Sequence, residues 1–235
     1  MLLRVASYNV HSFRGGLDAV ASVLIEASGG QPLDVVFLQE CGSTRAVRRF
    51  SGHLGMEAVS SHRLFNRVRN AVVYRPPLKL TGEPSVRDLT HQSRSLRRGF
   101  IAATLRADVI RFAAVSVHLG LVPSERLRHG RELTDFLAGL RCPVVMGADL
   151  NEGPDGPAAR WLGARLFDAF DGERKGSADT FPAAAPTARI DYMFLTSEFS
   201  VRRAWVGASA SAKAASDHRP VLAEIEMREP EGPRR

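Results

Sequence analysis

The sequence has little cysteine. Only two cysteines, Cys41 and Cys142, occur in 235 residues, and neither belongs to a CxxC motif. This argues against a scaffold held together by disulfides and favours a reducing, cytoplasmic compartment. We therefore expect two small buried side chains, with a disulfide between them as the less favoured alternative.

Long apolar runs are also absent, so no segment is expected to span a bilayer. The first residues reach polar Ser7 and Asn9 after a short apolar start, which lacks the apolar core of a secretion signal. With 44% hydrophobic and 24% charged residues, the composition is typical of a soluble globular protein. We expect a monomer with one domain at residues 1–227 and a disordered tail at residues 228–235.

Aromatic residues are few, at 7% of the chain, whereas the net charge is +7. A positive field concentrates phosphorylated molecules near a protein surface, which favours an anionic substrate. Scattered arginine is also what coding bias alone would produce, and composition does not separate these two explanations.

Apolar and β-branched runs bounded by turn residues predict nine strands. These cover residues 2–10, 34–38, 70–74, 100–105, 110–118, 143–146, 190–195, 201–206 and 221–227. Helical spacing of apolar residues predicts helices at residues 18–28, 44–54 and 124–140. Because strands alternate with helices and the runs at 100–105 and 110–118 form an apparent antiparallel hairpin, we expect an α/β (α+β) fold with mixed sheets.

Carboxylates, amides and histidines follow the apolar runs, at strand ends where open α/β folds usually build their sites. In SYNVHS, strand alternation places Ser7, Asn9 and His11 on one face. Asn9 would bind a metal or a phosphate oxygen there, or simply turn the chain. In DVVFLQE, a buried run ends at Glu40, which is either a Mg²⁺ ligand or a solvated residue at the start of a helix.

Two further segments suggest general acid–base chemistry. In VVMGADLNEGPDG, Asp149 and Asn151 share a face, so that the carboxylate can accept a proton from water while the amide holds the water or the phosphate. Asp191 interrupts the apolar strand of RIDYMFL and needs a partner, which His218 of SDHRPV can supply. The alternatives are an Asx-rich turn in the first segment and a polar turn at Asp217 and His218.

Three other residues stand at strand ends. His118 closes AAVSVHLG and is expected to face inward, whereas Asn70 and Arg98 begin strands. His118 is either a catalyst or a hydrogen-bonded structural group, whereas Asn70 and Arg98 are either phosphate ligands or plain surface residues. Residues 172–188, rich in Gly, Ala and Pro, are the best candidate for a long active-site loop.

Taken in order, the segments from SYNVHS to SDHRPV resemble the endonuclease/exonuclease/phosphatase superfamily over nearly the whole chain. The resemblance implies the deoxyribonuclease I-like fold, a four-layer sandwich of two packed mixed β-sheets flanked by helices. It also implies a Mg²⁺-dependent hydrolase of phosphoric ester bonds, in which Mn²⁺ can replace Mg²⁺.

The resemblance further implies roles for individual residues. The metal ligands would be Glu40, Asp217 and, directly or through water, Asn9. Asp149 would orient or deprotonate the attacking water, with Asn151 beside it.

On the opposite side of the reacting phosphate, the resemblance implies two histidines. His218, held by Asp191, would stabilise the phosphorane or its leaving oxygen, and His118 would contact a phosphate oxygen. Asn70 and Arg98 would be phosphate ligands.

Three residues depart from the pattern of the superfamily. Ala148 and Arg69 replace glycines that usually precede the catalytic Asp and the strand Asn. His11 stands where some repair nucleases have a metal-binding Asp, which weakens the case for a second metal.

Several functions remain open at this stage. A nucleic-acid backbone would suit the arginines at positions 45, 48, 49, 63, 67, 69, 94, 97 and 98. The scarcity of aromatics to stack on bases keeps phospholipids and small phosphoesters as alternatives. A catalytically inactive binding module of the same fold is a further alternative. A zinc hydrolase using His11, His118 and His218 is the poorest one, because the three lack zinc-site spacing.

Overall fold

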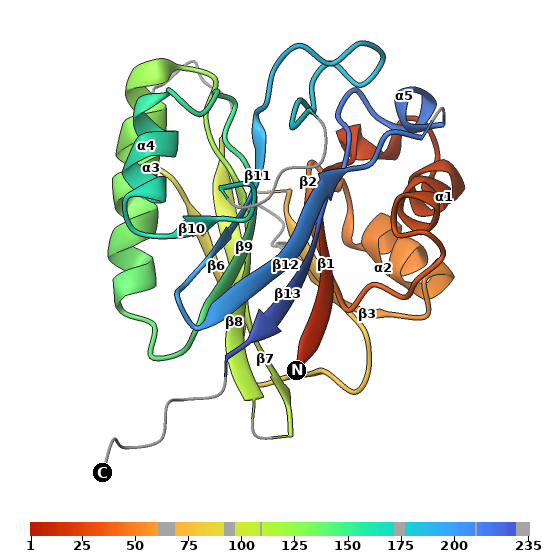
Figure 1. Cartoon of the computed structure of the whole chain (residues 1–235), viewed down its shortest axis with the longest axis horizontal. Helices are drawn as coiled ribbons and strands as arrows, with labels where there is room; N and C mark the ends of the chain where they lie inside the picture. Colours follow the sequence, from red (N-terminus) through yellow and green to blue (C-terminus); the bar gives the residue numbers. More distant parts are fainter. Residues whose placement is uncertain (61–68, 92–96, 109, 172–176, 210, 229–235) are drawn as a thin grey trace.

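Two β-sheets pack face to face, and helices cover both outer faces (Figure 1). The computed structural model describes residues 1–60, 69–91, 97–108, 110–171, 177–209 and 211–228. Each sheet contains both parallel and antiparallel pairs. The predicted four-layer sandwich of two mixed sheets is therefore confirmed.

The first sheet has six strands in the order β12-β13-β1-β2-β4-β3. These are β1 (Leu2–Asn9), β2 (Val35–Gln39), β3 (Glu57–Ser60), β4 (Ala71–Tyr74), β12 (Phe199–Val206) and β13 (Val221–Met227). Strand β1 pairs in parallel with β2 and antiparallel with β13, so the first strand of the chain lies inside the sheet.

The second sheet has seven strands, in the order β10-β11-β9-β8-β7-β5 with β6 paired to β7. These are β5 (Lys79–Leu80), β6 (Ser85–Asp88), β7 (Gly99–Ala107), β8 (Ile110–His118), β9 (Val144–Asp149), β10 (Phe167–Asp168) and β11 (Asp191–Leu195). The predicted hairpin is present, because β7 and β8 pair antiparallel across a turn at Asp108.

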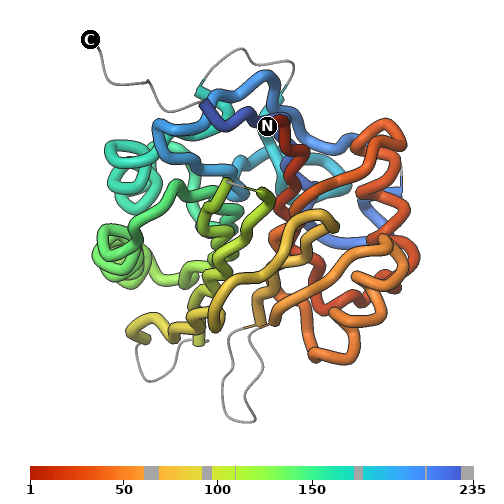
Figure 2. Tube along the Cα trace, turned by 90° about the horizontal axis from the view of Figure 1, so that it is seen from below, coloured from red at the N-terminus to blue at the C-terminus, as the bar shows by residue number. Residues whose placement is uncertain are grey.

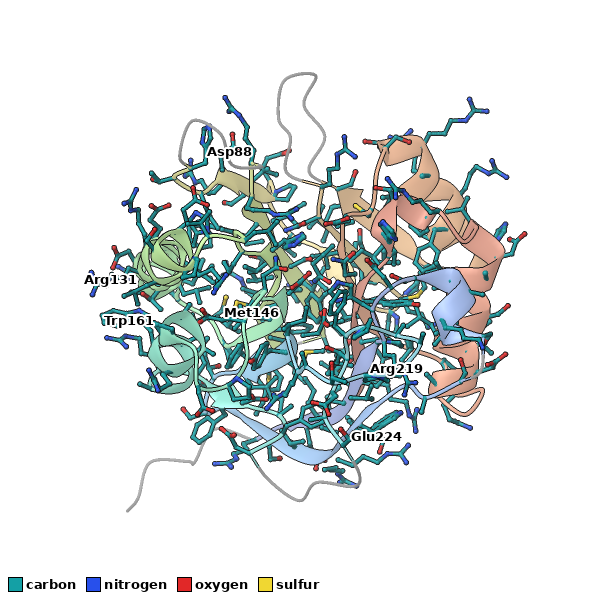
Figure 3. The ribbon with its side chains drawn as sticks, turned by 90° about the horizontal axis from the view of Figure 1, so that it is seen from above. Asp88, Arg131, Met146, Trp161, Arg219 and Glu224 are labelled. Atoms are coloured by element: carbon teal, nitrogen blue, oxygen red, sulfur yellow. The ribbon has the colours of Figure 1, made fainter. Side chains whose placement is uncertain are left out.

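The helices divide between the two outer faces, as Figures 1 and 2 show from two directions. The first sheet is covered by α1 (Leu17–Ala27), α2 (Thr44–His53) and the short α5 (Ala212–Ala215), with the single turn η1 (His11–Phe13) following β1. The second sheet is covered by α3 (Pro123–Ala138) and α4 (Pro157–Gly163). In Figure 3, Met146 of β9 lies in the interior, whereas Arg131 of α3 and Trp161 of α4 lie at the edge.

Strand alternation separates the core between the sheets from the layers under the helices. On β8, Phe112 and Ala114 pack between the sheets, while Ala113 and Val115 pack toward α3. Continued along the strand, the same alternation brings Ser116 into the space between the sheets, two residues before the end of β8 at His118. The period of two therefore directs polar residues inward only where the strands end.

Two other expectations can be compared with the structure. Cys41 and Cys142 are both free thiols, so the disulfide alternative is wrong, and Cys142 is only half-buried. Within the described part of the chain, no helix has the length and apolarity needed to cross a membrane. Residues 229–235 of the expected tail lie outside the described residues.

Candidate active site

The candidate site lies at one end of the sandwich, where strands of both sheets end together. In the second sheet, the pairing of β8, β9 and β11 places His118, Asp149 and Asp191 side by side in one row. Asn9 ends β1 of the first sheet and faces this row. Segments far apart in the sequence therefore meet, as the polar strand ends predicted.

Asp149 is the residue that most of the others contact, and only 1% of its surface is exposed. Its Oδ2 atom accepts a hydrogen bond of 2.8 Å from Asn9 Nδ2, which links the two sheets. The Oδ1 atom accepts a 3.0 Å hydrogen bond from the backbone N–H of Asn151. His118 Nε2 lies 3.2 Å from Oδ2. Amide and imidazole groups thus surround a buried carboxylate at the centre of the site.

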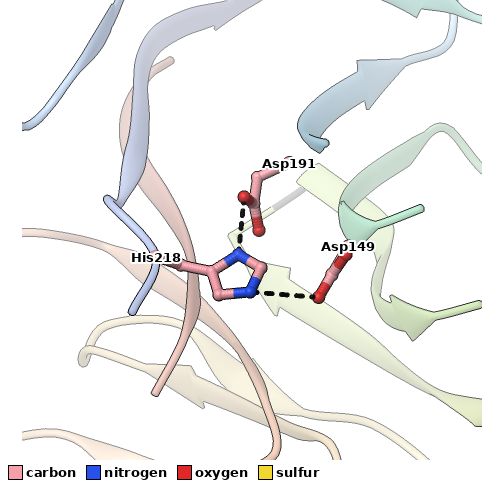
Figure 4. A group of neighbouring side chains, drawn as sticks. All are labelled: Asp149, Asp191 and His218. Carbon is pink, nitrogen blue, oxygen red and sulfur yellow. Dashed lines mark hydrogen bonds and ion pairs between the residues drawn. The ribbon is translucent and has the colours of Figure 1, made fainter. Parts of the chain in front are cut away.

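His218 and Asp191 form the predicted contact (Figure 4). The Nδ1 atom of His218 lies 2.9 Å from Asp191 Oδ2, and its Nε2 atom lies 3.9 Å from Asp149 Oδ2. Burial alone would lower the pKa of His218, but the carboxylates of Asp191, Asp149 and Asp217 outweigh it and raise this pKa to about 10. The imidazole is therefore a cation at neutral pH, held between two carboxylates.

His118 has the opposite protonation state. Burial, together with the cations of Arg98 and His218, lowers the pKa of His118 to about 3 although Asp149 opposes the shift. Arg98 Nη1 lies 3.3 Å from His118 Nδ1 and can only donate, so Nδ1 must accept. The single ring proton then sits on Nε2, which lies 3.2 Å from Asp149 Oδ2. Asn151 Nδ2 lies 3.0 Å from the same Nε2 and donates instead to the Leu119 carbonyl. One histidine of the site is neutral and the other is charged.

Glu40 and Arg98 form an ion pair beside His118. Arg98 Nη1 lies 3.4 Å from Glu40 Oε1, and His118 Nδ1 lies 3.9 Å from the same oxygen. The backbone of Glu40 is left-handed, with φ of 51°, a conformation that non-glycine residues rarely adopt. Arg98 is largely buried, and its Nε atom has no hydrogen-bond partner among the described residues. A buried donor without a partner is a site for an acceptor such as a phosphate oxygen.

Asp217 lies on the more exposed side of the site, with 45% of its side chain accessible. Its Oδ1 atom lies 3.4 Å from His11 Nδ1, a contact that is an ion pair only when His11 is protonated. The turn that carries Asp217 and His218 is anchored by Ser216, whose hydroxyl donates to the Asn9 carbonyl at 2.7 Å. His11 begins a turn in which three successive residues have positive φ, and such strain is most common at functional sites.

The predicted metal ligands Glu40 and Asp217 have different ionic partners. Glu40 pairs with Arg98, whereas Asp217 pairs with His11. Within the described part of the chain, one group of three His, Cys, Asp or Glu residues has ligand atoms that all lie within 4.8 Å of one another. It consists of Asp149, Asp191 and His218. The three histidines of the zinc alternative do not gather in this group.

Asn70 lies one layer beneath the other predicted residues and is 1% exposed. Its Nδ2 atom donates to the carbonyl oxygens of Gly99 and Ser116, at 2.9 and 3.0 Å. Both of its N–H donors thus bind the backbone of the second sheet. Its role as a phosphate ligand stays a prediction that this bonding does not favour.

The two departures at glycine positions leave the reacting groups in place. Ala148 points away from the site, into the core under the helices. Arg69 is exposed, and its carbonyl accepts a 2.8 Å hydrogen bond from the N–H of Cys41, just after Glu40. Ala148 therefore does not face the site, and the Arg69 side chain is exposed to solvent.

The sequence did not identify every residue that contacts the site. Phe181 packs its ring against His218, with centroids 5.0 Å apart. It belongs to the expected active-site loop, of which residues 172–176 lie outside the described part. In the same loop, Ala183 donates from its backbone N–H to the Asp217 carbonyl at 2.7 Å. The loop was predictable from its composition, whereas the individual contact of Phe181 was not.

The arginines of the nucleic-acid hypothesis are only partly described. Positions 45, 48, 49, 69 and 97 are exposed, and positions 63, 67 and 94 lie outside the described residues. Arg97 forms an ion pair of 3.8 Å with Asp88. These exposed cations are compatible with an anionic substrate and do not by themselves select one.

A sequence model of the endonuclease/exonuclease/phosphatase family matches residues 6–218. No curated protein matches the chain. The match spans every residue of the row that meets at the site.

Solved structures of low sequence identity share the fold. An endonuclease/exonuclease/phosphatase from Bacteroides vulgatus has a TM-score of 0.80 at 19% identity, covering 97% of this chain and 99% of its own. A mannosyl-6-phosphatase from Bacteroides thetaiotaomicron has a TM-score of 0.81 at 19% identity, covering 96% and 100%. D. rerio TDP2 complexed with single-strand DNA product has a TM-score of 0.78 at 17% identity, covering 96% and 99%.

Proposed function

The chain belongs to the endonuclease/exonuclease/phosphatase family, and from this we propose that it is a metal-dependent phosphodiesterase, formed by a single domain at residues 1–227. The observation that carries the proposal is the row of buried acid and imidazole groups around Asp149. Ionisable groups are costly to bury even when they are paired, and their presence together at the end of both sheets favours a catalytic role.

Asp149 is proposed to orient and deprotonate the attacking water. The carboxylate can accept a proton, while Asn9 and the Asn151 backbone fix both of its oxygens. The neutral His118 donates toward the same carboxylate and prevents it from rotating away. These contacts support a base that is held in one orientation before the substrate arrives.

His218 is proposed to stabilise the negative charge that develops on the phosphorane or the leaving oxygen. Its cation is maintained by Asp191, and its Nε2–H faces the centre of the site. Arg98 is proposed to bind a phosphate oxygen, which its unpartnered Nε atom supports. His118 and Asn70 are proposed to lie along the same phosphate, with less support for Asn70.

The balance of charge fits a divalent cation. The carboxylates of Glu40, Asp149, Asp191 and Asp217 share the site with two cations, Arg98 and His218, and His11 adds a third only when it is protonated. Carboxylate and amide oxygens are the ligands that Mg²⁺ prefers. We propose that Glu40, Asp217 and Asn9 hold it, with Mn²⁺ as a substitute. The ion would supply Lewis-acid polarisation of the phosphoryl oxygen.

Structural relatives support a phosphate ester as the substrate. One is described as a mannosyl-6-phosphatase, and another binds a single-strand DNA product. The positive net charge favours a polyanion, so we propose a phosphodiester, including nucleic acid. Phospholipids and small phosphoesters are the alternatives. The two free thiols fit a cytoplasmic location.

A substrate panel tests the proposal. Purified protein with Mg²⁺ or Mn²⁺ is incubated with bis(p-nitrophenyl) phosphate, plasmid DNA, RNA, a hexose 6-phosphate, inositol phosphates and phospholipid vesicles, with EDTA in parallel. We expect turnover of phosphodiesters that EDTA abolishes and added Mg²⁺ restores. Phosphate binding without metal-dependent turnover of any ester would instead identify an inactive binding module.

A further inference from the structure

A layer of buried polar side chains lies between the apolar core and the candidate site. Ser7, Gln39, Asn70 and Ser116 are each at most 1% exposed. Strand alternation places each of them on the same face as residues of the core between the sheets. Along the facing surfaces of the two sheets, the side chains are therefore apolar in the core, polar but uncharged in this layer, and charged at the candidate site.

Hydrogen bonds in this layer run from one sheet to the other. Gln39 Nε2 lies 3.2 Å from Ser116 Oγ and 3.4 Å from the Gly147 carbonyl, both in the second sheet. Ser116 Oγ donates to the Leu38 carbonyl of the first sheet at 2.7 Å. Because the Gly147 carbonyl can only accept, it fixes which end of the Gln39 amide points across.

Ser116 takes part in more of these hydrogen bonds than any other residue of the layer. Its hydroxyl joins Leu38 and Gln39, and its carbonyl accepts from Asn70 Nδ2 at 3.0 Å. It stands two residues before His118, while Gln39 directly precedes Glu40. The bonds of Ser116 therefore connect the ends of β2, β4 and β8 immediately beneath the site.

From this geometry we infer that Ser116 and Gln39 are positioning residues, which hold the two halves of the site, one on each sheet, at a fixed separation. Apolar packing between sheets is not directional and allows small sliding movements, whereas hydrogen bonds between buried groups define one register. The inference that a fixed separation of the sheets matters for catalysis rests on the proposed phosphodiesterase function. The inference that these hydrogen bonds fix the separation is independent of that function.

The test compares Ser116→Ala and Gln39→Met with Ala114→Gly. Ala114 lies on the same strand and face, within the apolar core, and serves as a control for general loss of stability. Amide hydrogen exchange is measured without substrate at Leu119 and Cys41 near the site, and at Asp34 and Arg75 at the other end of the sheets. The backbone N–H of each of these four is hydrogen-bonded.

We expect Ser116→Ala and Gln39→Met to speed exchange at Leu119 and Cys41 by about fivefold to tenfold relative to Asp34 and Arg75, as for one lost buried hydrogen bond. The effect of the double variant should be less than the sum of the two single effects, because both changes break the Ser116–Gln39 bond, although each also breaks a separate bond, to Leu38 or to Gly147. With a phosphodiester as substrate, the kcat of Ser116→Ala and of Gln39→Met should fall about tenfold or more, with KM nearly unchanged. Ala114→Gly should keep the kcat of the wild type even where its thermal midpoint is lowered to the same value as theirs.

Two results would overturn the inference: uniform acceleration of exchange over all four amides, or an equal loss of kcat in Ala114→Gly and Ser116→Ala. Absence of any turnover by the wild-type protein would contradict the proposed function alone. In that case the exchange ratios still decide whether the polar layer fixes the separation of the sheets.

Discussion

Asp149 is the residue on which most contacts of the site depend, and it can be changed with little change of shape. Asp149→Asn keeps an oxygen that Asn9 Nδ2 can reach but removes the group that accepts a proton from water. We expect kcat to fall by about 10²-fold to 10⁴-fold, the usual contribution of a general base. The protein should still fold with a lowered thermal midpoint, because the amide nitrogen of Asn would face the Asn151 N–H that now donates to Oδ1. Turnover of a chromogenic phosphodiester and thermal unfolding measure these two effects.

Asp155→Asn is the matched control. Asp155 follows in the same Gly-rich segment and is exposed, so its loss should leave the rate unchanged. A near-normal rate in Asp149→Asn would contradict the role proposed for this carboxylate.

Single residues also show where sequence-based prediction ends. The polar residues at strand ends were sufficient to predict that His218 contacts Asp191, because a carboxylate in an apolar strand requires a partner. The left-handed backbone at Glu40 and Asn151 was not predictable, because no glycine marks either position. Nor could the sequence give the depth of Asn70, whose donors are bound to a neighbouring sheet.

Among the elements, α3 carries a buried histidine that fixes the loop after β8. His129 Nδ1 accepts from the Gly120 N–H at 3.2 Å, and Nε2 lies 2.7 Å from the Thr90 carbonyl, to which it must donate. Both contacts use the neutral ring. Burial lowers the pKa of His129, although the Thr90 carbonyl and nearby carboxylates partly oppose it.

The lowered pKa predicts an acid-sensitive contribution to stability. At a pH below the ordinary histidine pKa of about 6.5, the unfolded chain binds a proton that the folded protein resists. The contribution of His129 is therefore complete above that pH and is lost as the pH falls toward the folded pKa. Urea unfolding at pH 7.5 and pH 5 should show a smaller decrease in the free energy of unfolding for His129→Gln than for the wild type.

His53→Gln serves as the comparison, because His53 is 44% exposed and belongs to α2 on the other sheet. His53 contacts Asp18 at 2.7 Å on the surface and lacks the buried contacts of His129, so His53→Gln should not reproduce the effect of His129→Gln. An identical decrease in all three proteins would show that the pH effect arises elsewhere.

The elements that the sequence predicted are those with a strong apolar period. All nine strands and three helices are present, with ends that shift by a few residues. The elements missed are short or half-exposed: the strands β3, β5, β6 and β10, the helices α4 and α5, and the turn η1. Such strands exist because a longer neighbour offers a free edge, which is a tertiary effect that no local pattern encodes.

At the scale of the whole molecule, the two sheets approach closely at Gly147. A Cβ atom at this position would lie 2.5 Å from Phe37 Cβ in the facing sheet. Gly147→Ala should therefore lower the free energy of unfolding by about 1–3 kcal/mol, as for other overpacked cores. Urea unfolding measures the loss.

Gly163→Ala is the control, since nothing lies within 4 Å of a Cβ built at that helix terminus. Adding Phe37→Leu to Gly147→Ala should not recover the loss, because leucine keeps the Cβ atom that the new methyl group would meet. A free energy of unfolding of Gly147→Ala equal to that of the wild type would show that the sheets adjust elsewhere.

The position of β1 between β13 and β2 has a consequence for biosynthesis. Leu2 pairs with Glu226 and Ser7 with Val221, so β1, which is made long before β13, receives one of its two neighbours only when β13 is made. Until then, one hydrogen-bonding edge of β1 stays open to water, chaperones or other nascent chains. Pairing between strands that lie far apart in the sequence is slow. Faster translation therefore does not shorten the step in which β13 pairs with β1.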